Sequence, residues 1–175
     1  MLFVDIAIVG KESIKIKGKQ ASFVIDPVAG MSKVGGDAII LLGGGEGIDV
    51  SRVTDSRIIL AGPGSYEVGG VKILGTKTIK GTIYKMTMDG ITTIIGSSAE
   101  VKTEGFNACQ VLIVDTTDEF SESFVTALEP KITILYGEKK NEAAKTLGVE
   151  NVSVVSKLTV AKDKLPDEME TVVLG

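Results

Sequence analysis

The segment with the clearest chemical potential is a glycine-rich loop that follows an apolar run. Residues 38–42 read Ala-Ile-Ile-Leu-Leu, and residues 43–47 contain four glycines around Glu46. Glycine permits positive φ angles, and successive backbone N–H groups in such a loop can hold a phosphate. The loop lacks the Lys-Ser/Thr ending of a P-loop and the G-x-G-x-x-G spacing, and Glu46 would face the phosphate. A solvated loop is therefore favoured over a nucleotide site.

The chain contains no histidine, which removes several chemistries together. General base catalysis near neutral pH, Ser-His and Cys-His nucleophiles and most zinc sites depend on imidazole. The one cysteine, Cys109, has no partner for an internal disulfide, and it lies in the apolar stretch 108–114, where a small buried residue is expected. These mechanisms are excluded in their usual form.

Composition sets the class of protein. A chain of 175 residues can bury a full core as one domain or as two small similar halves. Lys and Arg number 19 against 23 Asp and Glu, so nucleic acid is not expected as a partner. No apolar run is long enough to cross a membrane, and residues 1–9 alternate like a strand without a basic signal-peptide region. A cytoplasmic protein is expected.

Short apolar and alternating runs predict a chain dominated by strands. Strands are predicted at residues 1–9, 13–17, 22–25, 38–42, 56–60, 71–74, 81–88, 91–95, 111–114, 131–135, 151–155, 157–160 and 171–174, with a short helical turn at 49–53. The dipeptide Asp89-Gly90 indicates a two-residue hairpin turn. The apolar character of residues 38–42 implies cover on both faces of that strand.

Two helices are predicted in the second half. Residues 116–119, Thr-Thr-Asp-Glu, have the spacing of a capping box before a helix that runs from Phe120 to Leu128 and stops at Pro130. A second helix spans residues 141–147 and is closed by Gly148. The strands exceed what one sheet usually holds, so we expect an α/β protein with two packed sheets and helices outside.

Several segments together match one family in order. They are residues 10–18, 23–27, 37–48, 62–71, 129–137 and 158–169. The most specific are Gly-Pro-Gly-Ser-Tyr-Glu-Val-Gly-Gly-Val at 62–71 and Asp-Lys-Leu-Pro-Asp-Glu-Met at 163–169. With these motifs the chain resembles the metallo-β-lactamase-fold hydrolase superfamily, in particular its short, lactonase-like bacterial branch. The resemblance implies a four-layer αββα sandwich with few and short helices.

The resemblance further implies a single domain over residues 1–175, built from two similar halves at about 1–75 and 76–175. It also implies an active site along one edge of the sheets, at positions that no longer carry its metal ligands. The family's His-x-His-x-Asp-His motif falls on Gly43, Gly45, Gly47 and Ile48, its early histidine on Lys11, a later histidine near Lys80, its bridging aspartate near Ser97 or Ser98, and its last histidine on Gly137. We therefore expect a degenerate member without a metal cofactor.

Three residues match supporting positions of the family. Asp26, at the end of its strand, matches a carboxylate that supports the metal loop, and the simplest role for it here is to accept N–H bonds from that loop. Tyr66 and Glu67 match a turn, where Tyr packing and a loop hydrogen bond are favoured over contact with a ligand.

These observations predict a metal-free, non-catalytic protein of this fold with a binding or structural role. One alternative is an anion or small-molecule site that uses the loop at 43–47 with Lys11 and Lys80; another is a metal-independent hydrolase with Lys11, Lys80 or Tyr136 as base. The carboxylates Asp26, Glu46 and Asp49 could hold a hard cation, but a solvated loop is favoured. Self-association or a protein partner is expected, because short strands leave exposed edges.

Overall fold

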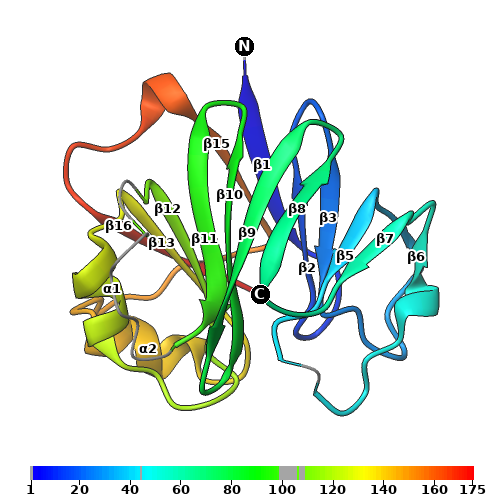
Figure 1. The fold of residues 1–175 in the computed structure, drawn as a ribbon. Helices are drawn as coiled ribbons and strands as arrows, with labels where there is room; N and C mark the ends of the chain where they lie inside the picture. Colours follow the sequence, from blue (N-terminus) through cyan, green and yellow to red (C-terminus); the bar gives the residue numbers. More distant parts are fainter. Residues whose placement is uncertain (1, 44, 99–105, 107–108) are drawn as a thin grey trace.

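The computed structural model describes residues 2–43, 45–98, 106 and 109–175. Gly44 of the glycine loop and Ala108 of the apolar stretch lie outside the described residues. Two mixed sheets face each other, as Figure 1 shows, and two short helices cover one side. Within the described residues, no helix is long and apolar enough to span a membrane.

The first sheet has six strands. They are β1 Phe3–Ile8, β2 Ile14–Lys17, β3 Ser22–Ile25, β5 Ala38–Ile40, β7 Ile58–Leu60 and β15 Lys157–Ala161, in the spatial order β15-β1-β2-β3-β5-β7. The strands β3, β5 and β7 run parallel to one another, whereas β15, β1 and β2 pair antiparallel. The carboxyl ends of β3 and β5 therefore meet at one edge of this sheet.

The second sheet has eight strands. They are β8 Gly64–Val68, β9 Val71–Thr78, β10 Gly81–Met88, β11 Ile91–Ser97, β12 Val111–Asp115, β13 Ile132–Tyr136, β14 Val154–Val155 and β16 Glu170–Leu174, in the order β14-β16-β13-β12-β11-β10-β9-β8. The predicted hairpin between β10 and β11 is confirmed, since Asp89 and Gly90 have φ angles of 52° and 76°. Positive φ at both central residues is what a type I′ turn requires.

The main core lies between the two sheets. Side chains from both inner faces form one cluster, including Ile25 and Ile40 of the first sheet and Ile113 and Ile134 of the second. A second cluster lies between the outer face of the eight-stranded sheet and the helices α1 Glu122–Leu128 and α2 Lys140–Thr146. Cover on both faces explains why Val111–Val114 form a continuous apolar run with no exposure.

The fourth layer is small. Over Val24 and Ile39, on the outer face of the six-stranded sheet, the cover comes from Val53 and the partly buried Val34. Val34 and Val53 belong to the two-residue strands β4 Val34–Gly35 and β6 Val53–Thr54, which have no counterpart among the predicted strands. Next to them is the short turn η1 Val50–Arg52, and a second such turn, η2 Lys162–Lys164, follows β15.

The predicted capping box before α1 is wrong. The helix begins at Glu122 with Ser121 at its N-cap, and Phe120 precedes it. The hydroxyl of Thr116 donates instead to the Tyr136 carbonyl oxygen at 2.7 Å. Thr116 directly follows β12, and the neighbouring strand offers it a better partner than a distant helix start, so tertiary pairing overrides the local signal.

Candidate functional site

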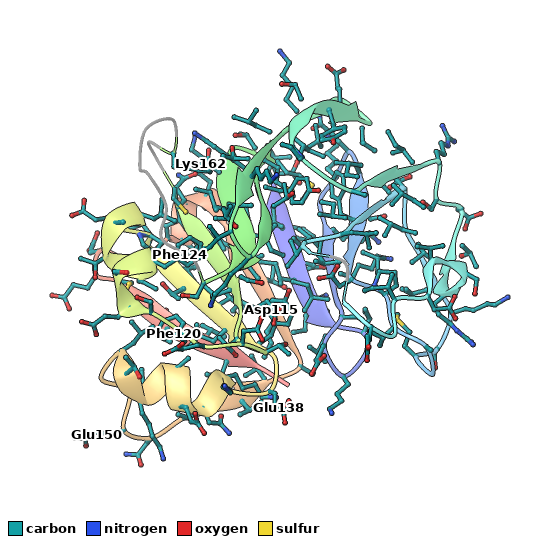
Figure 2. All side chains as sticks on the ribbon, turned by 60° about the horizontal axis from the view of Figure 1, so that its bottom comes forward. Asp115, Phe120, Phe124, Glu138, Glu150 and Lys162 are labelled. Carbon is teal, nitrogen blue, oxygen red and sulfur yellow. The ribbon has the colours of Figure 1, made fainter. Side chains whose placement is uncertain are left out.

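A cleft of about 400 Å³ lies at the edge where the carboxyl ends of strands from both sheets meet. Its walls follow β3, β5, β11 and β12 and include the turn between β9 and β10. The lining residues are Glu12, Asp26, Val28, Leu42, Gly43, Gly45, Glu46, Ile48, Lys80, Ser97, Asp115, Thr117 and Asp118. Figure 2 turns this edge forward and shows Asp115 between the two sheets, with Phe120 and Phe124 on the helical side.

Asp26 fixes the start of the glycine loop. Its Oδ1 accepts a hydrogen bond from the Leu42 N–H at 3.0 Å, and its carbonyl oxygen accepts one from the Ser13 hydroxyl at 2.6 Å. Its φ angle of 44° turns the chain out of β3, a conformation that aspartate tolerates better than most residues. Burial raises its pKa to about 6 against the opposing effect of the Leu42 bond, and the nearby Asp115 raises it further.

Asp115 ends β12 on the opposite wall. Its Oδ1 accepts two hydrogen bonds from Thr117, from the backbone N–H at 2.9 Å and from the hydroxyl at 2.6 Å. Burial is the main cause of its raised pKa; the Thr117 bonds act against it, and Asp118 adds to it. Neither Asp115 nor Glu12, Thr117 and Asp118 was predicted as a site residue. The available signal was the strand–helix–strand unit, since side chains after buried parallel strands gather at one edge of the sheet.

Two predicted positions are closed by neighbouring atoms. A Cβ on Gly43 would lie 3.0 Å from the Lys80 carbonyl oxygen, and the backbones of the two segments are joined by a Thr82 N–H bond to the Leu42 carbonyl at 2.6 Å. A Cβ on Gly137 would lie 2.9 Å from Asp115 Oδ1 and 2.9 Å from the Thr117 nitrogen. At Gly45 and Gly47, by contrast, a Cβ would meet no described atom within 4 Å.

Most of the predicted site residues line the cleft, but some do not. Asp26, Gly43, Gly45, Glu46, Ile48, Lys80 and Ser97 line it, whereas Lys11, Gly47 and Gly137 do not. The Lys80 ammonium donates to the Glu119 carbonyl oxygen at 3.1 Å. Asp49 faces Ser51 and Arg52, with its Oδ2 3.0 Å from Arg52 Nε, so the proposed carboxylate trio of Asp26, Glu46 and Asp49 does not converge.

The predicted pocket residues separate in the structure. Tyr66 and Glu67 line a different cleft beside β8 and β9, and the Tyr66 hydroxyl donates to the Gly62 carbonyl oxygen at 2.8 Å. Tyr66 therefore packs its own turn. Tyr136 is fully buried at the carboxyl end of β13, next to Asp115 in the sheet register. Its hydroxyl has no hydrogen-bond partner among the described residues.

Comparison with known proteins gives a consistent result for the fold. No family model matches the sequence, and no curated protein matches it. A solved structure described as a putative Zn-dependent hydrolase of the metallo-β-lactamase superfamily, from Thermotoga maritima, superposes with a TM-score of 0.78 at 19% identity over 98% of both chains. A structure described as a putative metal-dependent hydrolase, from Parabacteroides distasonis, gives a TM-score of 0.64 at 14% identity, over 98% of this chain and 94% of that one. The metallo-β-lactamase fold protein YhfI from Bacillus subtilis gives 0.60 at 12% identity, over 91% and 99%.

This chain has the metallo-β-lactamase fold. The resemblance of the sequence motifs is thus confirmed at the level of architecture. At such low identities, the likeness establishes the fold and not the reaction.

The residues at the edge of this metallo-β-lactamase fold do not fit the metal that the fold implies. The whole chain lacks imidazole, and its one cysteine is buried in the cluster beneath the helices. Within the described residues, no group of three or more Cys, Asp or Glu side chains is arranged to hold a metal ion. Zinc takes nitrogen, sulfur and carboxylate ligands in a close tetrahedral set, and the aligned positions offer glycine, isoleucine, lysine and serine instead.

Proposed function

We propose that this protein is a metal-independent, non-catalytic member of the metallo-β-lactamase fold that binds a small molecule in the cleft at the sheet edge. One observation carries the proposal. The resemblance places metal-binding histidines at Gly43 and Gly137, but a side chain at Gly43 would press on the Lys80 carbonyl oxygen, and one at Gly137 would press on Asp115 and Thr117. A histidine at either position would displace these groups. The backbone at these two positions therefore fits glycine, and the cleft at the sheet edge remains available to a small molecule.

The charges of the cleft argue against the anion-binding alternative. Five carboxylates line it, from Glu12, Asp26, Glu46, Asp115 and Asp118, and the lining lysine directs its ammonium at a carbonyl oxygen. Lys11 is exposed and does not line the cleft. An anion would meet net repulsion there.

The structure offers little support for the alternative of a metal-independent hydrolase, because neither Tyr136 nor Lys80 is placed to act as a base. Burial raises the pKa of Tyr136 well above its usual value, and Asp115, Asp26 and Glu12 raise it further. A tyrosine with a raised pKa stays protonated at neutral pH and is a poor general base. The ammonium of Lys80, the other lining candidate, is bonded to Glu119.

Metal analysis of the purified protein tests the proposal. We expect no stoichiometric zinc, iron or manganese after dialysis, and no gain of hydrolase activity toward ester or lactone substrates when zinc is added. Gly45→His serves as a comparison, because its side chain has open space but no partner ligands in the described structure. Near one equivalent of a transition metal in the unaltered chain would overturn the proposal.

We also propose that the chain self-associates and that it is cytoplasmic. The edge strand β7 presents Ile58 and Ile59, which are 40% and 45% exposed, and an open edge with apolar side chains favours pairing. A chain with a single buried cysteine also suits a reducing compartment. Sedimentation at micromolar concentration that shows only monomer would contradict the expected self-association.

A further inference from the structure

A buried threonine on the outer face of the eight-stranded sheet is paired with an exposed methionine. Thr133 lies in β13 between Ile132 and Ile134, whose side chains belong to the core between the sheets. Its own side chain therefore points to the opposite face, which carries Leu135 and the two helices, and it is fully buried there. The Thr133 hydroxyl donates to the sulfur of Met169 at 3.5 Å, and within the described residues it makes no other hydrogen bond.

The sulfur is a weak acceptor for this hydroxyl. A buried hydroxyl normally bonds to oxygen or nitrogen, and a poor partner leaves part of its desolvation cost uncompensated. Thr116, which is also fully buried, shows the ordinary case, since its hydroxyl donates to the Tyr136 carbonyl oxygen at 2.7 Å. Thr133 is therefore a buried donor whose acceptor could be improved.

The chain around Met169 is fastened to the strand that carries Thr133. The Lys131 ammonium donates to the Asp167 carbonyl oxygen at 2.8 Å, and the Glu170 N–H donates to the Lys131 carbonyl oxygen at 3.0 Å. Directly after Met169, β16 pairs parallel with β13. These contacts on both sides of the residue hold Met169 beside Thr133.

Met169 is also accessible from solvent. The residue is 44% exposed and lines a cleft of about 490 Å³ between α1 and the end of α2. Figure 1 shows these two helices on the same side of the molecule. Met31, Met86 and Met88 are 7%, 1% and 1% exposed. Among the described methionines, Met169 is thus the one that a small solute reaches from water.

We propose that Met169 is a site of oxidation by hydroperoxides and that the Thr133 hydroxyl stabilises the resulting sulfoxide. A lone pair of the sulfur attacks one oxygen of hydrogen peroxide, the O–O bond breaks, and the leaving hydroxide takes the proton of the transferred OH group to form water. The thioether is oxidised by two electrons, and the peroxide is reduced.

The sulfoxide oxygen gives Thr133 a stronger acceptor. Methionine has three rotatable side-chain bonds, so the new oxygen can turn toward the buried hydroxyl. Oxidation normally disrupts a packed region, because it introduces a polar group among apolar ones. Here the donor offsets that cost. The inference is independent of the proposed function, since this cleft shares no lining residue with the one at the sheet edge.

Treatment of the purified protein with hydrogen peroxide, followed by mass spectrometry of its peptides, tests which methionine reacts. We expect Met169 to gain one oxygen about tenfold faster than Met31, Met86 or Met88, because susceptibility follows exposure. Cys109 should react slowly, because burial raises the pKa of its thiol to about 12 and leaves little thiolate. Equal rates at the four methionines would overturn the inference.

Thermal denaturation before and after oxidation tests the role of the hydroxyl. Thr133→Val is close in shape but removes the donor. Oxidation should lower its melting temperature by about 3 °C more than that of the unaltered chain, which is the effect of one lost hydrogen bond in a protein of this size. Thr126→Val is the matched control, because Thr126 lines the same cleft but donates to the Glu122 carbonyl oxygen of its own helix. It should respond to oxidation like the unaltered chain.

Two methionine variants assign the response to one residue. Met169→Leu should abolish the change of melting temperature on oxidation in the Thr133→Val background, whereas Met31→Leu should keep it. A change that persists in Met169→Leu would overturn the inference, and so would an equal fall in Thr133→Val and the unaltered chain. These outcomes do not depend on metal content or on the cleft at the sheet edge, so the proposed function stands or falls separately.

Discussion

Two groups of glycines in and beside the cleft differ in what surrounds them, and we call the group of Gly43, Gly81 and Gly137 the closed wall and the group of Gly45 and Gly47 the open wall. On one wall, Gly81 and Gly43 bring the β9–β10 turn against the end of β5, and Gly137 lies against Asp115 and Thr117. On the other wall, Gly45 and Gly47 face open space. The closed wall is also fastened by Tyr84, whose hydroxyl lies 3.2 Å from the carbonyl oxygens of Leu41 and Leu60 and accepts the Gly62 N–H at 2.9 Å.

The difference shows that glycine has two roles at one site. In the closed wall it allows two backbones to approach, and this joins the two sheets beside the cleft. In the open wall it only leaves the loop without side chains. A side chain at Gly45 or Gly47 would fit sterically, whereas one at Gly43, Gly81 or Gly137 would press on neighbouring atoms.

Of the substitutions considered, Gly81→Ala should cause the largest loss in the free energy of unfolding. The added methyl group would overlap the Leu42 carbonyl oxygen and lie 2.9 Å from Gly43 Cα, at a φ angle of +132°. Strain and overpacking together should lower the free energy of unfolding by about 4 kcal/mol. Gly62→Ala, with a similar φ of +150° but no neighbour within 4 Å, is the matched control and should lose about 1–2 kcal/mol. Equal losses by chemical denaturation would mean that the close approach of the backbones does not matter.

Gly137→Ala sharpens the comparison at the second closed position. Its φ is +102°, and the methyl group would press on Asp115 and Thr117, so we expect a loss of about 3 kcal/mol. Gly47→Ala has a φ of +87° in open space and should lose about 1 kcal/mol. The difference between the two variants measures crowding separately from backbone strain, and its absence would contradict the closed-wall description.

Asp26→Asn tests how burial affects the carboxylate that accepts the Leu42 N–H at the start of the glycine loop. The pKa of Asp26 is raised to about 6 in the folded protein from its ordinary value of 3.8, so the folded state binds more protons between those values. This group therefore contributes stability below about pH 4, which is lost as the pH rises to about 6; the full effect is about 3 kcal/mol.

The Asn variant keeps an acceptor for the Leu42 N–H and should lack this decline, which makes it about 2 kcal/mol more stable than the unaltered chain at pH 7. Asp163→Asn, at an exposed site, is the control and should keep the decline. Denaturation curves measured from about pH 4 to about pH 7 check the result. An unchanged slope in Asp26→Asn would show that Asp26 is not the group responsible.

Gly45→Ala should have the smallest effect. The position has no positive φ angle and no neighbour within 4 Å, so the free energy of unfolding should change by no more than about 0.5 kcal/mol. A thermal melt is sufficient to measure it. A loss comparable to that of Gly137→Ala would mean that the open wall is as crowded as the closed one.

The sequence by itself determined the local elements and the chemistry that is missing. Alternating and continuous apolar runs encode strand and burial in neighbouring residues, and β3 and β10 were predicted with their observed bounds. The lack of histidine excludes the usual zinc ligands whatever the fold, because composition does not depend on conformation. The specific motifs at 62–71 and 163–169 were sufficient to indicate the architecture, which the structural comparison confirms.

Only the tertiary structure decided which side chains meet. Asp26, Lys80 and Asp115 lie far apart in sequence, and their proximity depends on the order and register of strands in two sheets. For the same reason, the sequence could not show that Thr116 would bond to Tyr136 rather than cap a helix, or that Tyr66 would face another cleft. Local patterns record the preferences of adjacent residues, whereas a site is made by long-range pairing, which sets the burial, charge and free acceptors of each group.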